Sequence, residues 1–383
     1  MGAVFEFATA TRIVFGAGKA ALVPALVKEC GASKVLIVTG KRTERAQPLA
    51  LALAGLGVEH AVFPIDGEPT VDHVRRGVLV GRGCDAVVGW GGGSALDGGK
   101  AIAALLGNGG DPLDYLEVVG RGQTLSRPSL PFVAVPTTAG TGSEVTRNAV
   151  LGVPQSQVKA SLRSPFMLPS VAVVDPDLLI GLPTEVLRSS ALDALAQNIE
   201  PFLSSAANPL TDALCQQGIE RSARSVRRAV LDGPDGAARD DLALASLYGG
   251  LALANAGLGA VHGFAAPLGG MFNAPHGAVC AALLAATLDV NHRALQSRAP
   301  THAALPRFEK LGLWLAGAPD AGAAVAWVIS LCRDLGVPGL ATYGVRPADV
   351  PQVVAKAKSA SSMKKNPLVL TDEELTEILT RSL

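Results

Sequence analysis

The most constraining feature of the chain is a run of three glycines between a strand pattern and a helix pattern. The apolar run Asp85 to Trp90 comes directly before Gly91, Gly92, Gly93 and Ser94, and a helical pattern begins near Gly98. Glycines allow backbone N–H groups to approach an anion closely, and a helix start adds partial positive charge. The stretch therefore predicts a cradle for a nucleotide diphosphate, with a purely geometric strand-to-helix turn as the alternative.

A second segment of the same kind follows the apolar run Phe132 to Val135. Between Pro136 and Thr146 the chain carries five hydroxyl side chains and two glycines. Hydroxyl groups can donate hydrogen bonds to phosphate and ribose oxygens. Two such turns in one chain strengthen the prediction of nucleotide binding.

Short β-rich runs alternate with alanine- and leucine-rich helical patterns in the first half of the chain. Strand patterns at 35–39, 60–63 and 86–88 alternate with helical patterns at 46–56 and 71–81. Alternation of this kind predicts a parallel sheet covered by helices on both faces. After Val171 to Asp175 strand signals nearly vanish, so we predict an α/β nucleotide-binding domain over residues 1–180 and an all-α domain over residues 181–383. We expect the active site in the cleft between them.

Composition excludes several classes of partner. The formal net charge is zero and there is no block of like charges, which argues against nucleic acid. We also expect no membrane association and a cytoplasmic enzyme, because no long apolar span or signal peptide is evident. The five cysteines show no paired spacing, so reduced and mostly buried thiols are expected rather than disulfides or a zinc knot.

Together, the two glycine-rich turns resemble those of the iron-containing (group III) alcohol dehydrogenase family, which shares its fold with dehydroquinate synthase and glycerol dehydrogenase. Further runs match in the same order along the chain: Arg12 to Gly18, Pro165 to Pro169, Val174 to Pro176, Pro275 to Gly277, and Asn366 with Pro367. The resemblance implies an NAD(P)-dependent oxidoreductase that interconverts a small alcohol with an aldehyde or ketone. We expect a homodimer.

In the resembled family, one aspartate and three histidines bind a divalent metal. This chain has Asp193, His262 and His276 at three of these positions and Gln197 at the fourth. Asp193 and Gln197 are four residues apart in a helical pattern, so they share one face. An amide oxygen is a weaker ligand for Fe²⁺ or Zn²⁺ than an imidazole, so metal affinity should fall. One carboxylate and two imidazoles still equal the three-ligand count of open zinc sites, so we expect an occupied site, with an empty one as the alternative. Ala266 also replaces a family histidine associated with proton transfer.

The resemblance places the catalytic residues His262, His276 and Gln197 at this same site. A bound metal would polarise the substrate carbonyl or stabilise an alkoxide. Without metal, an imidazolium of His262 or His276 could donate a hydrogen bond or a proton to the developing oxyanion.

Cofactor preference depends on the end of the strand at 35–39. Gly40 offers no carboxylate to repel a 2′-phosphate, and Lys41 and Arg42 could pair with one, so we expect NADP to be tolerated or preferred. Solvated cations are the alternative. The expected cofactor residues are Gly40, Lys41, Arg42, Gly91, Gly92, Gly93, Ser94, Asp97, Thr137, Thr138, Thr141, Ser143 and Lys159. The expected substrate residues are Asn148, Phe166, Phe264, Phe272 and Ser362.

Three other functions remain compatible with the sequence. One is a metal-independent reductase resembling maleylacetate reductases, and another is a lyase or cyclase on the same fold. The third is a nucleotide-binding protein without turnover, in which Gln197 and Ala266 mark lost catalysis.

Overall fold

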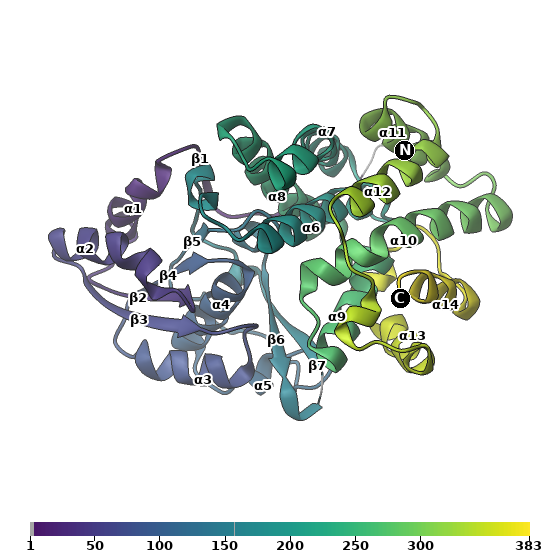
Figure 1. Ribbon diagram of the computed structural model, residues 1–383. Coiled ribbons are helices and arrows are strands. Elements are labelled where there is room, and N and C mark those ends of the chain that lie inside the picture. The colour runs from purple at the N-terminus through teal and green to yellow at the C-terminus, as the bar shows by residue number, and fades with distance from the viewer. Residues whose placement is uncertain (1–3, 157) are drawn as a thin grey trace. The chain divides into compact units, whose positions relative to one another are not determined.

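The computed structural model describes residues 4–156 and 158–383, which form two compact units (Figure 1). The first unit is Ala8–Gly181, and the second is Leu182–Leu383 together with residues 4–7. The first contains a parallel sheet and the second is largely helical, which confirms the predicted fold class.

The first unit is built on a six-stranded parallel sheet in the order β1-β8-β5-β4-β2-β3. Its strands are β1 (Arg12–Phe15), β2 (Lys34–Gly40), β3 (Glu59–Ile65), β4 (Ala86–Gly91), β5 (Phe132–Pro136) and β8 (Val171–Val174). In the register, Gly40 pairs with Ile65 and Gly91 pairs with Pro136. Parallel pairing therefore gathers the carboxyl ends of these strands, and the turns that follow them, at one edge of the sheet.

Alternate residues of each strand enter two separate cores, one on each face of the sheet. In β2, Val35 and Ile37 pack with the core of α1 and α2, whereas Leu36 and Val38 pack with the core of α3 and α4. A strand buried on both faces must be apolar throughout, which explains the continuous hydrophobic runs. The helices are α1 (Val23–Glu29), α2 (Gln47–Gly55), α3 (Val71–Val80), α4 (Gly93–Asn108) and the single turn α5 (Pro112–Tyr115).

Helix α4 begins at Gly93, five residues before the position expected from the sequence. Gly98 and Gly99 lie inside it rather than at its start. A Cβ atom on Gly98 would lie 2.1 Å from Ile65 Cδ1, and one on Gly99 would lie 2.8 Å from Phe132 Cε2. These glycines allow α4 to approach the sheet closely, at a helix-propensity cost of about 1 kcal/mol each.

An antiparallel hairpin of β6 (Asn148–Val153) and β7 (Val158–Arg163) packs beside α4 and was not expected from the sequence. Burial alternates along β6 with a period of two residues, as in a strand with one covered face. Its apolar residues Ala149, Leu151 and Val153 join the core of α4.

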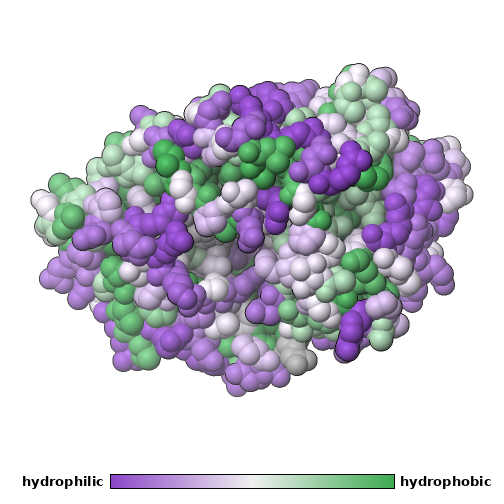
Figure 2. All heavy atoms as spheres, viewed as in Figure 1, coloured by the Kyte–Doolittle hydropathy of each residue, from purple (hydrophilic) through white to green (hydrophobic). Residues whose placement is uncertain are grey.

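The second unit consists of helices joined by short connections. They are α6 (Thr184–Leu203), α7 (Pro209–Leu231), α8 (Gly236–Ala256), α9 (Ala260–Phe272), α10 (His276–Arg298), α11 (Leu305–Ala316), α12 (Ala321–Asp334), α13 (Val350–Ser359) and α14 (Asp372–Arg381). Within the described residues, no single helix is both long and apolar enough to cross a membrane. Two pairs of consecutive helices reach the required length and apolar composition only when both helices of a bent pair are taken together. On the face drawn in Figure 2, polar residues predominate and apolar ones form small groups.

Lys100 is the largest buried side chain that carries a charge, and it connects α4 to the second glycine-rich turn. Its Nζ donates to Ser143 O (2.8 Å) and Thr146 Oγ1 (2.9 Å), and lies 3.3 Å from Asp97 Oδ1. Burial lowers the pKa of Lys100, although the carboxylates of Asp97 and Glu144 oppose that shift.

We expect Lys100→Met to destabilise the protein by about 3 kcal/mol, because it leaves the Asp97 carboxylate and buried carbonyl groups without their partner. Equilibrium urea unfolding of the full chain measures the change. The control is Lys28→Met, which removes an exposed lysine and should change stability by less than about 0.5 kcal/mol. Equal stability of the two variants would contradict the role assigned to Lys100.

Candidate active site

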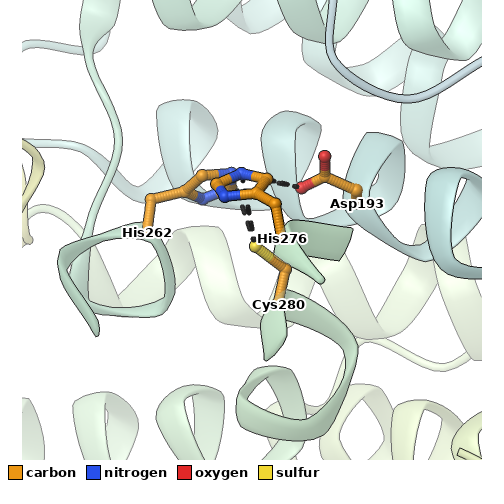
Figure 3. Close-up of side chains that lie close together, drawn as sticks. All are labelled: Asp193, His262, His276 and Cys280. Atoms are coloured by element: carbon orange, nitrogen blue, oxygen red, sulfur yellow. Dashed lines mark hydrogen bonds and ion pairs between the residues drawn. The ribbon is translucent and has the colours of Figure 1, made fainter. Parts of the chain in front are cut away.

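Four side chains of the second unit converge on one point (Figure 3). Asp193 comes from α6, His262 from α9, and His276 and Cys280 from α10. One potential ligand atom from each residue lies within 4.8 Å of all the others, and three of the four residues are buried. The structure therefore brings together Asp193, His262 and His276, as the resemblance implied, and adds a cysteine that the sequence analysis did not assign to the site.

Close helix packing brings these residues together. Gly277 is the second residue of α10, and a Cβ atom there would lie 2.6 Å from the carbonyl oxygen of Ser189 in α6. The absence of a side chain at Gly277 allows the start of α10 to contact α6 one turn before Asp193. His276 and Cys280 are four residues apart on α10 and share a face.

Glu200 fixes the orientation of His262. One carboxylate oxygen accepts a hydrogen bond from the backbone N–H of Val261 at the start of α9 (2.7 Å), and the other lies 2.6 Å from His262 Nδ1. Gly259 leaves room for this carboxylate, since a Cβ atom there would lie 2.9 Å from Glu200 Oε1. With Nδ1 bonded to Glu200, Nε2 of His262 faces Asp193 and Cys280, the arrangement by which a second carboxylate orients a metal-binding histidine.

The donor atoms are spaced as ligands of a single ion would be. Asp193 Oδ1 lies 3.2 Å from His262 Nε2 and 3.9 Å from His276 Nε2, and Cys280 Sγ lies 3.8 Å from each of those nitrogens. Ligands about 2.0–2.3 Å from a tetrahedral ion lie about 3.3–3.6 Å apart. Asp193 Oδ1 is buried and accepts no aligned hydrogen bond, so it is free to coordinate a cation. The residues fit a divalent metal.

Gln197 lies one turn beyond Asp193 on α6 and is buried. Its Oε1 also has no hydrogen-bond partner. An unsatisfied buried amide oxygen costs about 1–3 kcal/mol. Gln197 is therefore a second oxygen at this end of α6 with unused capacity to accept.

The four groups influence each other's protonation. Burial opposes charge on the imidazoles, but the interactions of His276 with Cys280 and Asp193 outweigh it and raise the pKa of His276 to about 9. Burial likewise opposes charge on His262, while Cys280 and Glu200 raise its pKa well above the usual value. Burial favours the neutral form of Asp193, yet the histidines hold its pKa below the usual range. Without metal, the group favours protonated imidazoles beside an ionised aspartate.

In the first unit, the two glycine-rich turns pack against each other. A Cβ atom on Gly92 would lie 3.2 Å from Thr138 Oγ1, and one on Gly93 would lie 2.6 Å from Thr141 Cγ2. Gly91 is equally restricted, because its Cβ atom would lie 3.3 Å from the backbone nitrogen of Gly40. Gly92 is the N-cap of α4, so the first backbone N–H groups of this helix have no partner within the helix.

Several other expected cofactor residues have partners within the protein. Asp97 Oδ2 accepts from Val150 N (2.9 Å), and Ser143 Oγ donates to Asp97 Oδ1. Lys159 Nζ lies 2.8 Å from Glu68 Oε1. These contacts hold the hairpin and the second turn against α4 and the segment that follows β3. These residues therefore have a structural role in addition to any contact with a nucleotide.

The expected substrate residues lie in both units and differ in exposure. Asn148 begins β6, and Phe166 is 43% exposed in the short helix Pro165–Met167. Phe272 and Ser362 are half-buried. Phe264 has no exposed surface, so in this structure it packs in the core of the second unit rather than lining a surface.

A parallel-sheet unit with a glycine-rich turn, followed by a helical unit with an aspartate-histidine cluster, is the combination that the family resemblance implied. The comparisons agree. Residues 10–176 match the family described as iron-containing alcohol dehydrogenase, and residues 188–383 match the C-terminal part of that family. The chain belongs to the iron-containing alcohol dehydrogenase family.

Its relatives cover the whole chain. A 1,3-propanediol dehydrogenase from Klebsiella pneumoniae is 35% identical, with 99% of each chain covered. An NAD-dependent methanol dehydrogenase from Bacillus methanolicus is 32% identical over 97% of each. The crystal structure of a 1,3-propanediol oxidoreductase matches with a TM-score of 0.92 at 33% identity, covering all of both chains. Family membership indicates an oxidoreductase that acts on alcohols or aldehydes.

We expect Gly93→Ala to weaken nucleotide binding at least roughly tenfold, about 1.4 kcal/mol, because the new Cβ atom displaces Thr141 and the turn around it. Fluorescence titration with NADH and NADPH measures the affinity. The variant Gly93→Ala/Thr141→Ser removes the clashing methyl group and keeps the hydroxyl, so it should recover part of the loss. Unchanged affinity in Gly93→Ala would show that the diphosphate binds elsewhere.

Proposed function

We propose that this protein catalyses NAD(P)-dependent interconversion of a small alcohol and an aldehyde or ketone, with the reacting oxygen bound beside His262 and His276. The observation that carries the proposal is the convergence of Asp193, His262 and His276 within a chain of this family. The names of relatives support it, since they include an NAD-dependent methanol dehydrogenase and a lactaldehyde reductase.

Asp193, His262 and His276 would hold a divalent metal. When bound, such an ion supplies Lewis acidity toward a substrate oxygen. The protein supplies the rest: Glu200 keeps Nε2 of His262 aimed into the site, and burial of Asp193 excludes water from one side of it. The His276 side chain is 38% exposed, so it can meet a substrate from solvent.

A metal-free reaction is the second candidate, and one observation favours it. His276 has a pKa raised to about 9, so it is protonated at neutral pH in the absence of metal. Its imidazolium could donate a proton to the oxyanion that forms as hydride reaches a carbonyl carbon. Gln197 in place of the third histidine is consistent with that route.

One experiment separates the two candidates. The purified protein is assayed with small aldehydes, ketones and primary alcohols, using both NADH/NAD and NADPH/NADP, before and after chelation, with metal content measured on each sample. Metal-dependent catalysis predicts loss of turnover on chelation and recovery with added Zn²⁺ or Fe²⁺. Unchanged turnover after complete metal removal would establish the metal-free route. Nucleotide binding without turnover across the whole panel would contradict the proposal.

We further propose that NADPH binds no worse than NADH. Gly40 is uncrowded, since a Cβ atom there would meet nothing within 4 Å. Lys41 and Arg42 follow directly, but Lys41 already lies 3.0 Å from Asp66 Oδ2, at the end of the adjacent strand β3. The local excess of positive charge is therefore smaller than the sequence alone suggests.

Gly40→Asp should raise the KM for NADPH at least roughly tenfold more than the KM for NADH, because the new carboxylate would repel the 2′-phosphate. The matched control is Gly40→Asn, which has the same size without the charge. Steady-state kinetics with both cofactors measure the ratio. Equal effects of the two substitutions would mean that position 40 does not face the 2′ position.

A further inference from the structure

Position 197 leaves the metal site short of one imidazole, and Cys280 occupies space beside the remaining ligands. Its Sγ lies 3.8 Å from Nε2 of His262 and 3.8 Å from Nε2 of His276. All four donor atoms of the group lie within 4.8 Å of one another. Figure 3 shows the thiol directed at the two imidazole rings from below, with the Asp193 carboxylate at their end.

Three features distinguish Cys280 from an ordinary buried cysteine. It is fully buried yet surrounded by polar groups, whereas Cys215, equally buried, has no such cluster around it. It follows His276 by four residues on one helix, so both side chains project to the same side of α10. The buried Asp193 Oδ1 points into the same space without an aligned hydrogen bond, so it has unused capacity to bind a cation there.

We propose that Cys280 is the fourth protein ligand, and that the resulting Asp193, His262, His276 and Cys280 set selects Zn²⁺ over Fe²⁺. This inference rests on the metal site of the proposed function and specifies its donor set. Thiolate is a soft ligand that favours Zn²⁺, whereas a site of imidazoles and a carboxylate alone discriminates less between Zn²⁺ and Fe²⁺. The spacings of 3.2–3.9 Å from the two imidazoles to Asp193 and Cys280 lie close to those of a tetrahedral zinc site.

Coordination replaces the thiol proton with a bond to the ion, and the released proton passes to solvent. No oxidant or reductant is required. Gln197 is then not a metal ligand. It is an uncharged residue next to the site on α6.

The test uses Co²⁺ as a spectroscopic replacement for Zn²⁺. Metal-free full-length protein is titrated with Co²⁺, and a thiolate-to-cobalt charge-transfer band in the near ultraviolet is expected. Cys280→Ala should lose the band. Its Zn²⁺ affinity should fall by more than the roughly 10–100-fold that is typical of losing a group that only hydrogen-bonds a metal ligand. Fe²⁺ affinity, measured without oxygen, should fall less. Cys332→Ser, at a cysteine of the same unit outside the group, should keep the band.

A second variant guards against loss of folding. Gln197→His/Cys280→Ala moves the fourth donor from α10 to α6, and it should regain Zn²⁺ binding without the charge-transfer band. Cobalt binding to the wild type without that band, no metal binding at all, or Zn²⁺ affinity unchanged in Cys280→Ala would each overturn the proposal. Turnover is measured separately: turnover without the band overturns only the ligand assignment, and the band without turnover overturns only the proposed catalysis.

Discussion

The carboxylate of Glu200 is the interaction on which the site depends most. It satisfies the backbone N–H of Val261 at the buried start of α9 and, with its other oxygen, holds Nδ1 of His262. A helix start left without such a partner would carry unsatisfied donors in a buried position. The same contact fixes which imidazole nitrogen faces the cluster. The same carboxylate thus caps α9 and orients His262 as a metal ligand. A change at Glu200 would therefore affect helix stability and metal binding together.

Much of the fold followed from hydrophobic patterning. Continuous apolar runs in β2, β4 and β5 predicted strands buried on both faces, and the two cores show that arrangement. The start of α4 was predicted five residues too late, because Gly98 and Gly99 were interpreted as local punctuation. Their real constraint is long-range, namely contact with Ile65 and Phe132. A single sequence shows that a glycine is present but not which distant side chain occupies the place of its Cβ atom.

Prediction of the site had a similar limit. Helical spacing placed Asp193 and Gln197 on one face, and the family resemblance added His262 and His276. The structure brings Asp193, His262 and His276 together with Cys280. The cysteines were expected to be ordinary reduced thiols because they lack paired spacing, and all five are indeed free. The sequence analysis did not place Cys280 at the metal site, although the four-residue spacing applied to Asp193 and Gln197 also connects Cys280 to His276. Glu200 left no comparable signal, because its partner is 62 residues away.

Gln197 carries an amide on α6 where the family has an imidazole. This substitution affects the location of the metal site and its chemistry differently. The location is set by helix packing, in which Gly277 brings α10 against Ser189, and a single ligand change leaves that packing intact. The chemistry depends on which donors remain. A carboxylate and two imidazoles already reach the three-ligand number of open zinc sites, so losing the third imidazole lowers affinity without removing the site. A donor from another helix can then restore the number of ligands. It also changes the softness of the ligand set, and with it the preferred ion. Fold therefore preserves where the metal would bind, while individual side chains decide which metal binds there.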